Sequence, residues 1–187
     1  PSWPALRRHV ELVRRLSRDP GAVPASARVA DEYLRLTCLT YSHEDNSARR
    51  RQAAELRRDH PQIAAQSIHV AAATADAATT AAFLAEDPGR ANLEGGPFEW
   101  PPLLYLAFAR VEPAPDEAAV LATANALLTA GADPNAGYLW QGLPTPFTAL
   151  TGALGEGEQG PDNQPRHPSA LALARLLLEA GADANDA

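Results

Sequence analysis

Apolar residues recur every three to four positions along much of the chain, which is the spacing of one face of an α-helix. In the N-terminal third these stripes cover residues 6–16, 26–41 and 47–59. Serine, a residue type that caps helices, stands at or shortly before the start of each stripe, and proline follows the first and the third. The pattern predicts a leading helix followed by a divergent helix pair, together spanning residues 1–61.

Further along the chain the stripes become shorter and come in pairs, and one of them is repeated. The run Ala-Leu-Leu-Thr-Ala-Gly-Ala-Asp-Pro-Asn at 126–135 recurs in altered form at 174–185, and a degenerate copy occupies 83–92. The leucines predict the buried face of a helix. We expect Gly131 and Gly181 to end these helices with a positive φ, because glycine adopts that conformation without steric cost.

Gly-Ala-Asp-x-Asn after a leucine-rich helix is a feature of ankyrin repeats, and this part of the chain resembles that family. Thr145-Pro146 is similar to the Thr-Pro that opens a repeat, with Thr145 as helix cap, and His69 is similar to the family's backbone-binding histidine. The resemblance implies an all-α fold, an ankyrin-type helical-hairpin solenoid with divergent N-terminal helices. It divides residues 62–187 into three ankyrin-like repeats, at about 62–97, 98–142 and 143–187.

The chain as a whole also resembles a group of bacterial ankyrin repeat domain-containing proteins. The likeness lies in a Ser-Trp-Pro helix start at Ser2 and in the segment Trp-Pro-Pro-Leu-Leu-Tyr-Leu at residues 100–106. It implies a bacterial ankyrin-repeat protein that functions in protein binding.

Two features depart from the usual ankyrin period of about 33 residues. The two clear Gly-Ala-Asp-x-Asn elements lie 50 residues apart, and most of the excess is a polar insertion at residues 155–168. Insertions in repeat proteins form loops on one face, which is often the binding face. The chain also ends after a turn where another repeat would begin, so we expect an apolar flank on residues 169–180 and consider a homodimer through this end.

Composition supports the helical interpretation and narrows the class of protein. The chain has 40 Ala and 24 Leu against 7 Val and 2 Ile, which favours helices over a β-sandwich or β-barrel. Cys38 is the one cysteine, so no intrachain disulfide can form. No apolar run reaches the roughly 18 residues of a membrane span, and no secretory signal is visible, although Pro1 is not a natural start. We therefore expect a cytoplasmic protein.

The net charge of −7 is unevenly distributed. Residues 1–60 carry 12 Arg and 8 acidic residues, whereas residues 61–187 carry 4 Arg and 15 acidic residues. The acidic part should repel nucleic acid. Carboxylates also interleave with the arginines at 49–58, which favours a solvated helix face or an acidic partner. Nucleic-acid binding is therefore not expected. If it occurred, it would involve the arginine-rich residues 1–60.

Few residues suggest catalysis or metal binding. Cys38 with His43 would be the candidate nucleophile and base, but the apolar neighbours of Cys38 favour a buried structural cysteine. Four side chains of the insertion could hold a hard cation, yet a solvated loop is the simpler interpretation. We therefore expect no catalytic residues, no metal site and no cofactor. The four side chains are Glu156, Glu158, Asp162 and His167.

The aromatic residues give the main functional hypothesis. Seven of the eleven lie in residues 98–147, in or near the turns between repeats, which project as β-hairpin fingers in ankyrin proteins. Aromatic side chains in such turns either pack finger against finger or form a contact patch for a partner. The predicted partner-binding residues are Phe98, Trp100, Tyr105, Tyr138, Trp140, Glu156, Glu158, Asp162 and His167.

Two functions follow from this arrangement. The first is a non-catalytic protein–protein interaction module that binds a peptide or protein on its concave, finger-bearing face. The acidic insertion would then select a partner with apolar and basic groups. The alternative is a small-molecule-binding protein or enzyme, with a pocket between the aromatic fingers and the 155–168 loop.

Overall fold

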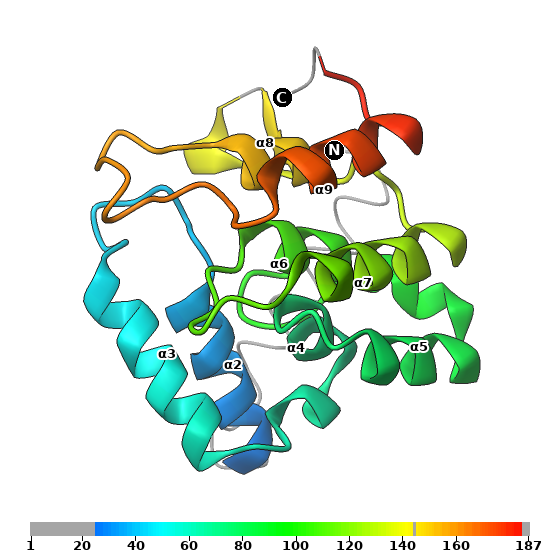
Figure 1. Cartoon of the computed structure of the whole chain (residues 1–187), viewed down its shortest axis with the longest axis horizontal. Coiled ribbons are helices and arrows are strands. Elements are labelled where there is room, and N and C mark those ends of the chain that lie inside the picture. The colour runs from blue at the N-terminus through cyan, green and yellow to red at the C-terminus, as the bar shows by residue number, and fades with distance from the viewer. Residues whose placement is uncertain (1–24, 144, 185–187) are drawn as a thin grey trace.

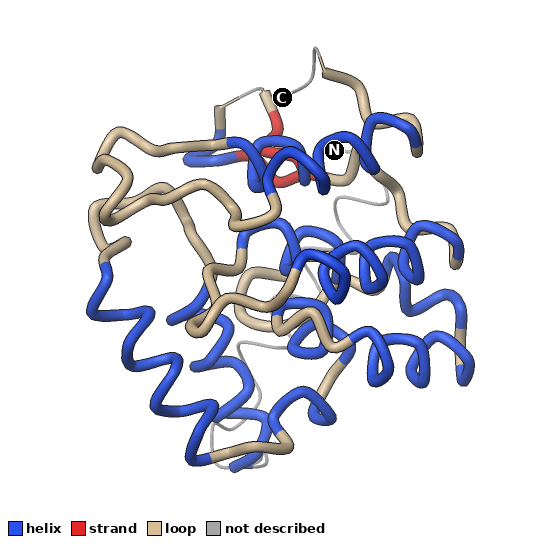
Figure 2. The backbone as a smooth tube through the Cα atoms, viewed as in Figure 1, coloured by secondary structure: helices blue, strands red, loops and turns tan. Residues whose placement is uncertain are grey.

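The computed structural model describes residues 25–143 and 145–184, and the expected leading helix lies outside them. These residues form a mainly α-helical protein with a small two-stranded sheet, which confirms the predicted helical class (Figures 1 and 2). The helices are α2 (Ala25–Thr37), α3 (Ser47–Asp59), α4 (Ile68–Ala73), α5 (Ala77–Glu86), α6 (Pro102–Phe108), α7 (Glu117–Thr129), α8 (Ala149–Leu154) and α9 (Ala170–Glu179). The short elements are the 3-10 helices η2 (Ile63–Gln66), η3 (Pro88–Asn92) and η4 (Trp140–Gly142) and the strands β1 (Gly137–Leu139) and β2 (Pro146–Thr148).

The helices from α4 onward lie in two rows (Figure 1). In one row α4 packs against α6 and α6 against α8; in the other α5 packs against α7 and α7 against α9. The helices α2 and α3 pack against each other, and α2 also contacts α4 at the start of the first row. Each helix therefore buries its apolar face against the corresponding helix of the next pair.

The core is centred on α6, which lies between α4 and α8. All seven residues of α6 are buried, including the large side chains of Tyr105 and Phe108. The second row contributes the leucines of the repeated run, of which Leu127 and Leu177 are fully buried. In the ranges that the structure describes, no helix is both long enough and apolar enough to cross a membrane.

Short polar side chains cap the N-termini of several helices. The carboxylate of Asp116 accepts a hydrogen bond from the Ala119 amide (2.7 Å), which satisfies one of the open donors at the start of α7. At α3 the cap is Asn46, which accepts from the Arg49 amide (3.0 Å). The stripe beginning at Ser47 thus correctly predicts α3, but Ser47 is its first helical residue and not the expected cap.

The start of α8 differs from the sequence-based expectation. Pro146 lies in β2, opposite Leu139 of β1, and not in the first turn of a helix. The helix begins only after Thr148, whose amide donates to the hydroxyl of Thr151 (3.2 Å). The prediction that Thr145 caps this helix is therefore wrong, because pairing in the hairpin keeps the chain extended for three further residues.

The glycines of the repeated run end α7 and α9 as expected. Gly131 has a φ of 94° and Gly181 a φ of 97°. The amide of Gly131 donates to the carbonyl of Leu128, and the amide of Ala132 donates to the carbonyl of Leu127, both at 3.0 Å. This bond pair closes the last turn of the helix, and the same pair recurs fifty residues later around Gly181.

The asparagine of each Gly-Ala-Asp-x-Asn element has a specific partner in the next copy. Asn135 donates from Nδ2 to the carbonyl of Gly181 (3.1 Å) and accepts at Oδ1 from the amide of Asp183 (2.7 Å). Asn92, in the degenerate copy, makes the same two bonds to Gly131 (2.7 Å) and Asp133 (2.9 Å). The copies of the repeated sequence are therefore joined by the same pair of hydrogen bonds.

Candidate functional site

Five of the eleven aromatic residues lie in two turns, residues 93–100 and 137–148, which we call the finger turns. In the second turn β1 and β2 pair antiparallel, with Tyr138 opposite Phe147. The ring of Trp100, from the first turn, stacks on the ring of Tyr138 with centroids 4.6 Å apart. The two finger turns thus pack against each other, which is the first of the two alternatives for their aromatic residues.

Two of the predicted partner-binding residues lie inside the protein. Trp100 is 4% exposed and Tyr105 is fully buried. The hydroxyl of Tyr105 donates to the carbonyl of Gly95 (2.8 Å) and accepts from the amide of Phe98 (3.2 Å). Neither side chain can reach a partner at the surface, and both stabilise the first finger turn.

The exposed part of the second finger turn consists of leucines. Leu139 is 58% exposed and Leu143 is 50% exposed, and they flank the half-buried Trp140. The exposure of Leu139 could have been predicted from the sequence, because successive side chains of an extended strand point to opposite faces. If Tyr138 and Trp140 pack inward together, Leu139 must face outward.

Tyr41 fills the space between the finger turns and the insertion. Its ring meets that of Phe147 edge to face at 5.4 Å, and its hydroxyl lies 3.2 Å from the carbonyls of Thr151 and Gly155. Next to it, Trp140 donates from Nε1 to the carbonyl of Thr40 (3.0 Å). The expected pocket between the aromatic fingers and the 155–168 loop is therefore replaced by a segment of the N-terminal helix pair.

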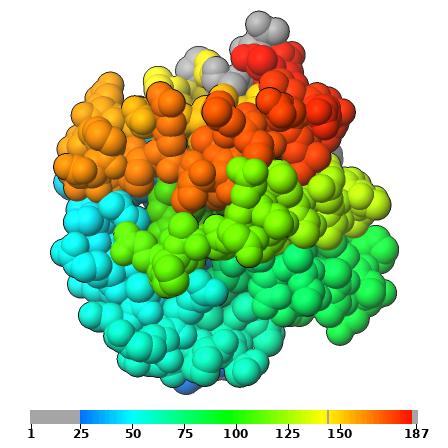
Figure 3. All heavy atoms as spheres, in the orientation of Figure 1, coloured from blue at the N-terminus to red at the C-terminus, as the bar shows by residue number. Residues whose placement is uncertain are grey.

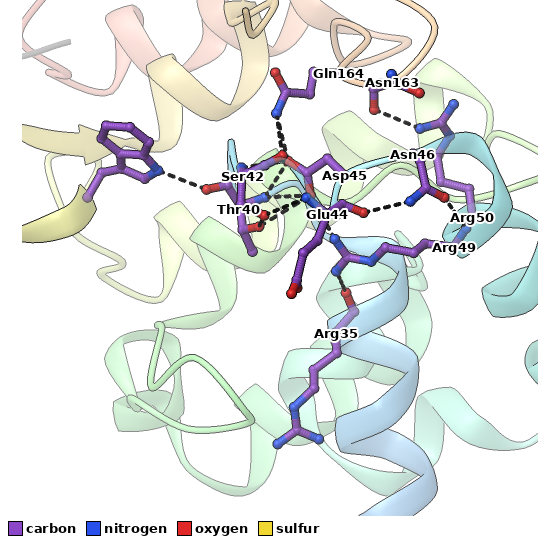
Figure 4. A network of polar contacts seen from close by, with 11 residues as sticks. Arg35, Thr40, Ser42, Glu44, Asp45, Asn46, Arg49, Arg50, Asn163 and Gln164 are labelled. Carbon is purple, nitrogen blue, oxygen red and sulfur yellow. Dashed lines mark hydrogen bonds and ion pairs between the residues drawn. The ribbon is translucent and has the colours of Figure 1, made fainter. Parts of the chain in front are cut away.

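The insertion is attached to that same segment through a buried polar network (Figure 4). Gln164 is 1% exposed and donates from Nε2 to the carboxylate of Asp45 (3.0 Å) and to the carbonyl of Ser42 (3.1 Å). Asp45 is 2% exposed and also accepts from the guanidinium of Arg49 (2.8 Å) and the amide of Thr40 (3.2 Å). One carboxylate thus orders the segment and holds the insertion.

Two glycines allow this close approach. A Cβ at Gly155 would collide with the hydroxyl of Tyr41, and one at Gly157 would collide with Oε1 of Gln164. The Gly-x-Gly spacing at residues 155–157 therefore permits tight packing of the insertion.

Two buried arginines complete the attachment. Arg50, 8% exposed, donates to the carbonyls of Asp162 (2.7 Å) and Asn163 (2.9 Å). Arg110, 3% exposed, donates to the carbonyls of Pro165 and Gly152, both at 2.7 Å, and to those of Ala107 and Ala109. Burial lowers the pKa of Arg110 to about 10, so it keeps its charge at neutral pH.

The acidic residues of the insertion differ in their contacts. Glu156 pairs with Arg166 at 3.0 Å, with both side chains largely exposed. Glu158 is exposed, and Asp162 takes part in the attachment through its carbonyl.

His167 is buried, 5% exposed, and its Nδ1 accepts from the amide of Ser169 (3.1 Å). Burial, with a smaller contribution from the charge of Arg110, lowers the pKa of His167 to about 3. The imidazole is therefore neutral at physiological pH and has a structural role.

The candidate nucleophile Cys38 lies inside the fold, whereas its candidate base His43 is exposed. Cys38 is 2% exposed, and burial raises the pKa of its thiol above the ordinary value. His69 bonds through Nε2 to the carbonyl of Leu93 (2.7 Å), at the first finger turn. Among the described residues no three His, Cys, Asp or Glu side chains gather in a way that could hold a metal ion.

The finger turns expose acidic as well as apolar side chains. The first finger turn exposes Glu94 and Glu99, and Asp133 is exposed just before the second. We call the exposed side chains of both turns the finger surface; in the described residues they are Leu93, Glu94, Glu99, Leu139, Gln141, Leu143 and Thr145.

The fold and the site define a mainly α-helical protein built from packed helix pairs, with an acidic, leucine-bearing surface at two linked turns. Comparison with family models, with curated proteins and with solved structures finds no match for this chain. Its function is therefore argued from its own residues.

Proposed function

We propose that this chain is an ankyrin-type repeat protein and acts as a non-catalytic module that binds a peptide or protein on its finger surface. The repeat interpretation is supported by the matching bonds of Asn92 and Asn135 and by the matching helix ends at Gly131 and Gly181. Two rows of helices that stack pair upon pair are consistent with it. Repeat arrays of this kind present extended binding surfaces.

The observation that carries the binding proposal is the combination of exposed leucines and acidic side chains on the finger surface. Exposed apolar side chains grouped on one surface mark interaction sites, and Leu139 and Leu143 lie on either side of η4. The exposed carboxylate of Glu94 on the same surface favours a partner with basic groups. The partner that fits this surface carries apolar and basic side chains.

Burial of the candidate nucleophile supports a role without catalysis. Cys38 is 2% exposed, whereas His43, its candidate base, is exposed to solvent. A substrate arriving from solvent would therefore not reach Cys38.

Site-specific photo-crosslinking in cells tests the proposal. A photoreactive amino acid at position 139 should capture a partner that the same residue at position 171, on the flank where a homodimer was considered, does not capture. Leu171 is a matched control because it is an exposed leucine, 77% accessible, on α9. The captured partner should contain a segment rich in basic and apolar residues. Equal capture from both positions, or capture from position 171 alone, would contradict the proposal.

A further inference from the structure

A second surface feature lies beside the insertion and shares no residue with the finger turns. It is an open hollow of about 540 Å³, lined by α3, by the segment after α6 and by the end of the insertion. These three segments meet on the face shown in Figure 3, where they are coloured cyan, green and orange. The lining residues that matter for its chemistry are Ser47, Arg50, Arg110, Val111, Pro165 and Arg166.

Positive charge converges on this hollow from three directions. Arg50, Arg110 and Arg166 come from three different segments, and two of them are buried. Arg110 donates to four carbonyl groups, and in the described part of the chain it has no carboxylate within ion-pair distance. A buried cation without an anionic partner creates a positive electrostatic potential around it. Binding of an anion nearby is therefore favourable.

Hydrogen-bond donors are also left over at the hollow. Arg166 uses only Nε, in an exposed pair with Glu156, so its two terminal nitrogens remain for a ligand. An exposed pair of this kind contributes about 0–1 kcal/mol, so exchanging Glu156 for a ligand carboxylate costs little. The first turn of α3, beginning at Ser47, adds the positive end of a 13-residue helix.

The walls of the hollow limit the charge and the size of the ligand. Glu112 pairs with Arg50 at 3.1 Å, and Asp162 also lines the hollow, so a highly charged anion would meet repulsion. Val111, Ala114 and Pro165 provide apolar wall. We propose that the hollow binds a monocarboxylate with a small apolar group, whether a free organic acid or the carboxyl end of a peptide.

Nuclear magnetic resonance titration of the whole chain tests this, with N-acetyl-leucine as the probe. It should bind with a Kd of about 1 mM, a strength typical of a ligand of this size, and shift the amide signals of Val111 and Ala114. N-acetyl-leucinamide, which lacks the charge, should bind at least tenfold more weakly. A short peptide ending in leucine, with a free or an amidated carboxyl end, separates the two sources of the carboxylate.

Matched variants locate the binding. Arg166→Gln should weaken binding of N-acetyl-leucine at least fivefold, whereas Arg175→Gln, at an exposed arginine on α9, should leave it unchanged. Both side chains are exposed, so neither change should unfold the protein. Equal binding of acid and amide, equal loss in both variants, tighter binding of inorganic phosphate, or no signal change at 20 mM probe (about twenty times the expected Kd) would each overturn the inference. Because the finger surface takes no part, none of these outcomes bears on the proposed protein-binding role.

Discussion

Four buried polar side chains lie in the insertion at residues 155–168 or in the network around it. Asp45, Arg110, Gln164 and His167 are each at most 5% exposed. Buried groups of this kind stabilise the fold only when their partners are in place, since an unmatched donor or acceptor costs about 1–3 kcal/mol. Substitutions at these positions should therefore have large and distinguishable effects.

His167 should make stability depend on pH. Its pKa is about 3 in the folded protein and about 6.5 in an unfolded chain. The unfolded state therefore takes up a proton first as the pH falls below 6.5, and the free energy of unfolding should drop by about 1.4 kcal/mol per pH unit between 6.5 and 3. His167→Asn keeps an acceptor for the Ser169 amide but cannot titrate, so urea unfolding at pH 7 and pH 5 should show a smaller loss in the variant. Identical losses in both proteins would contradict the assignment.

Two glycines should respond differently to the same substitution. A Cβ at Gly131 meets no atom within 4 Å, so Gly131→Ala should cost only the backbone strain of its positive φ, about 1 kcal/mol. A Cβ at Gly152 would lie 2.5 Å from the buried ring of Phe108, so Gly152→Ala should cost about 1–3 kcal/mol or more through overpacking. Thermal unfolding of both variants shows which substitution destabilises the protein more. A larger loss of stability in Gly131→Ala than in Gly152→Ala would contradict this account.

At the scale of the elements, the sequence was informative where structure is local. Within the described residues the apolar stripes correctly predicted helices, although the stripe at 26–41 forms a helix that ends at Thr37, and the glycines correctly predicted the ends of α7 and α9. The start of α8 was misplaced because Thr145-Pro146 is also compatible with a strand, and the choice depends on pairing with β1. A single sequence does not show that pairing.

The asparagine contacts between copies should stabilise the stack of helix pairs. Asn135→Ala removes two hydrogen bonds to the next copy, at Gly181 and Asp183, and should lower the free energy of unfolding by about 1–2 kcal/mol. Asn125→Ala is the matched control, because Asn125 is exposed in the middle of α7, where alanine is the better helix former. Denaturant unfolding should show a loss for the first variant and none for the second; equal stability of both would argue against the contact.

At the scale of the whole molecule, the insertion links the last helix pair to the N-terminal pair. The contacts of Tyr41, Asp45 and Arg50 with residues 151–164 join parts of the chain that are more than a hundred residues apart. The sequence did not predict them, because Gln164 looks like any polar loop residue until its partners are known. The same segment puts Tyr41 between the insertion and Phe147, where the candidate pocket was expected.

Breaking this link should free the insertion without unfolding the helices. Gln164→Ala leaves donors and acceptors of the network unmatched and should cost about 1–3 kcal/mol. Limited proteolysis should then cut within residues 156–162 faster than in the unchanged protein, while far-ultraviolet circular dichroism stays the same. Gln159→Ala is the control, since Gln159 is exposed and takes part through its backbone. Equal cleavage rates in both variants would show that the network does not hold the insertion.

The central claim is that the finger surface binds a partner with apolar and basic groups, and the affinity of the crosslinked partner tests it most directly. The double change Leu139→Ser and Leu143→Ser should weaken binding about tenfold or more, as expected for exposed apolar contact residues, whereas Leu171→Ser should leave the affinity unchanged. Binding should also weaken as salt is raised, because acidic side chains face a basic partner. An unchanged Kd in the double variant, or an equal loss in Leu171→Ser, would contradict the account.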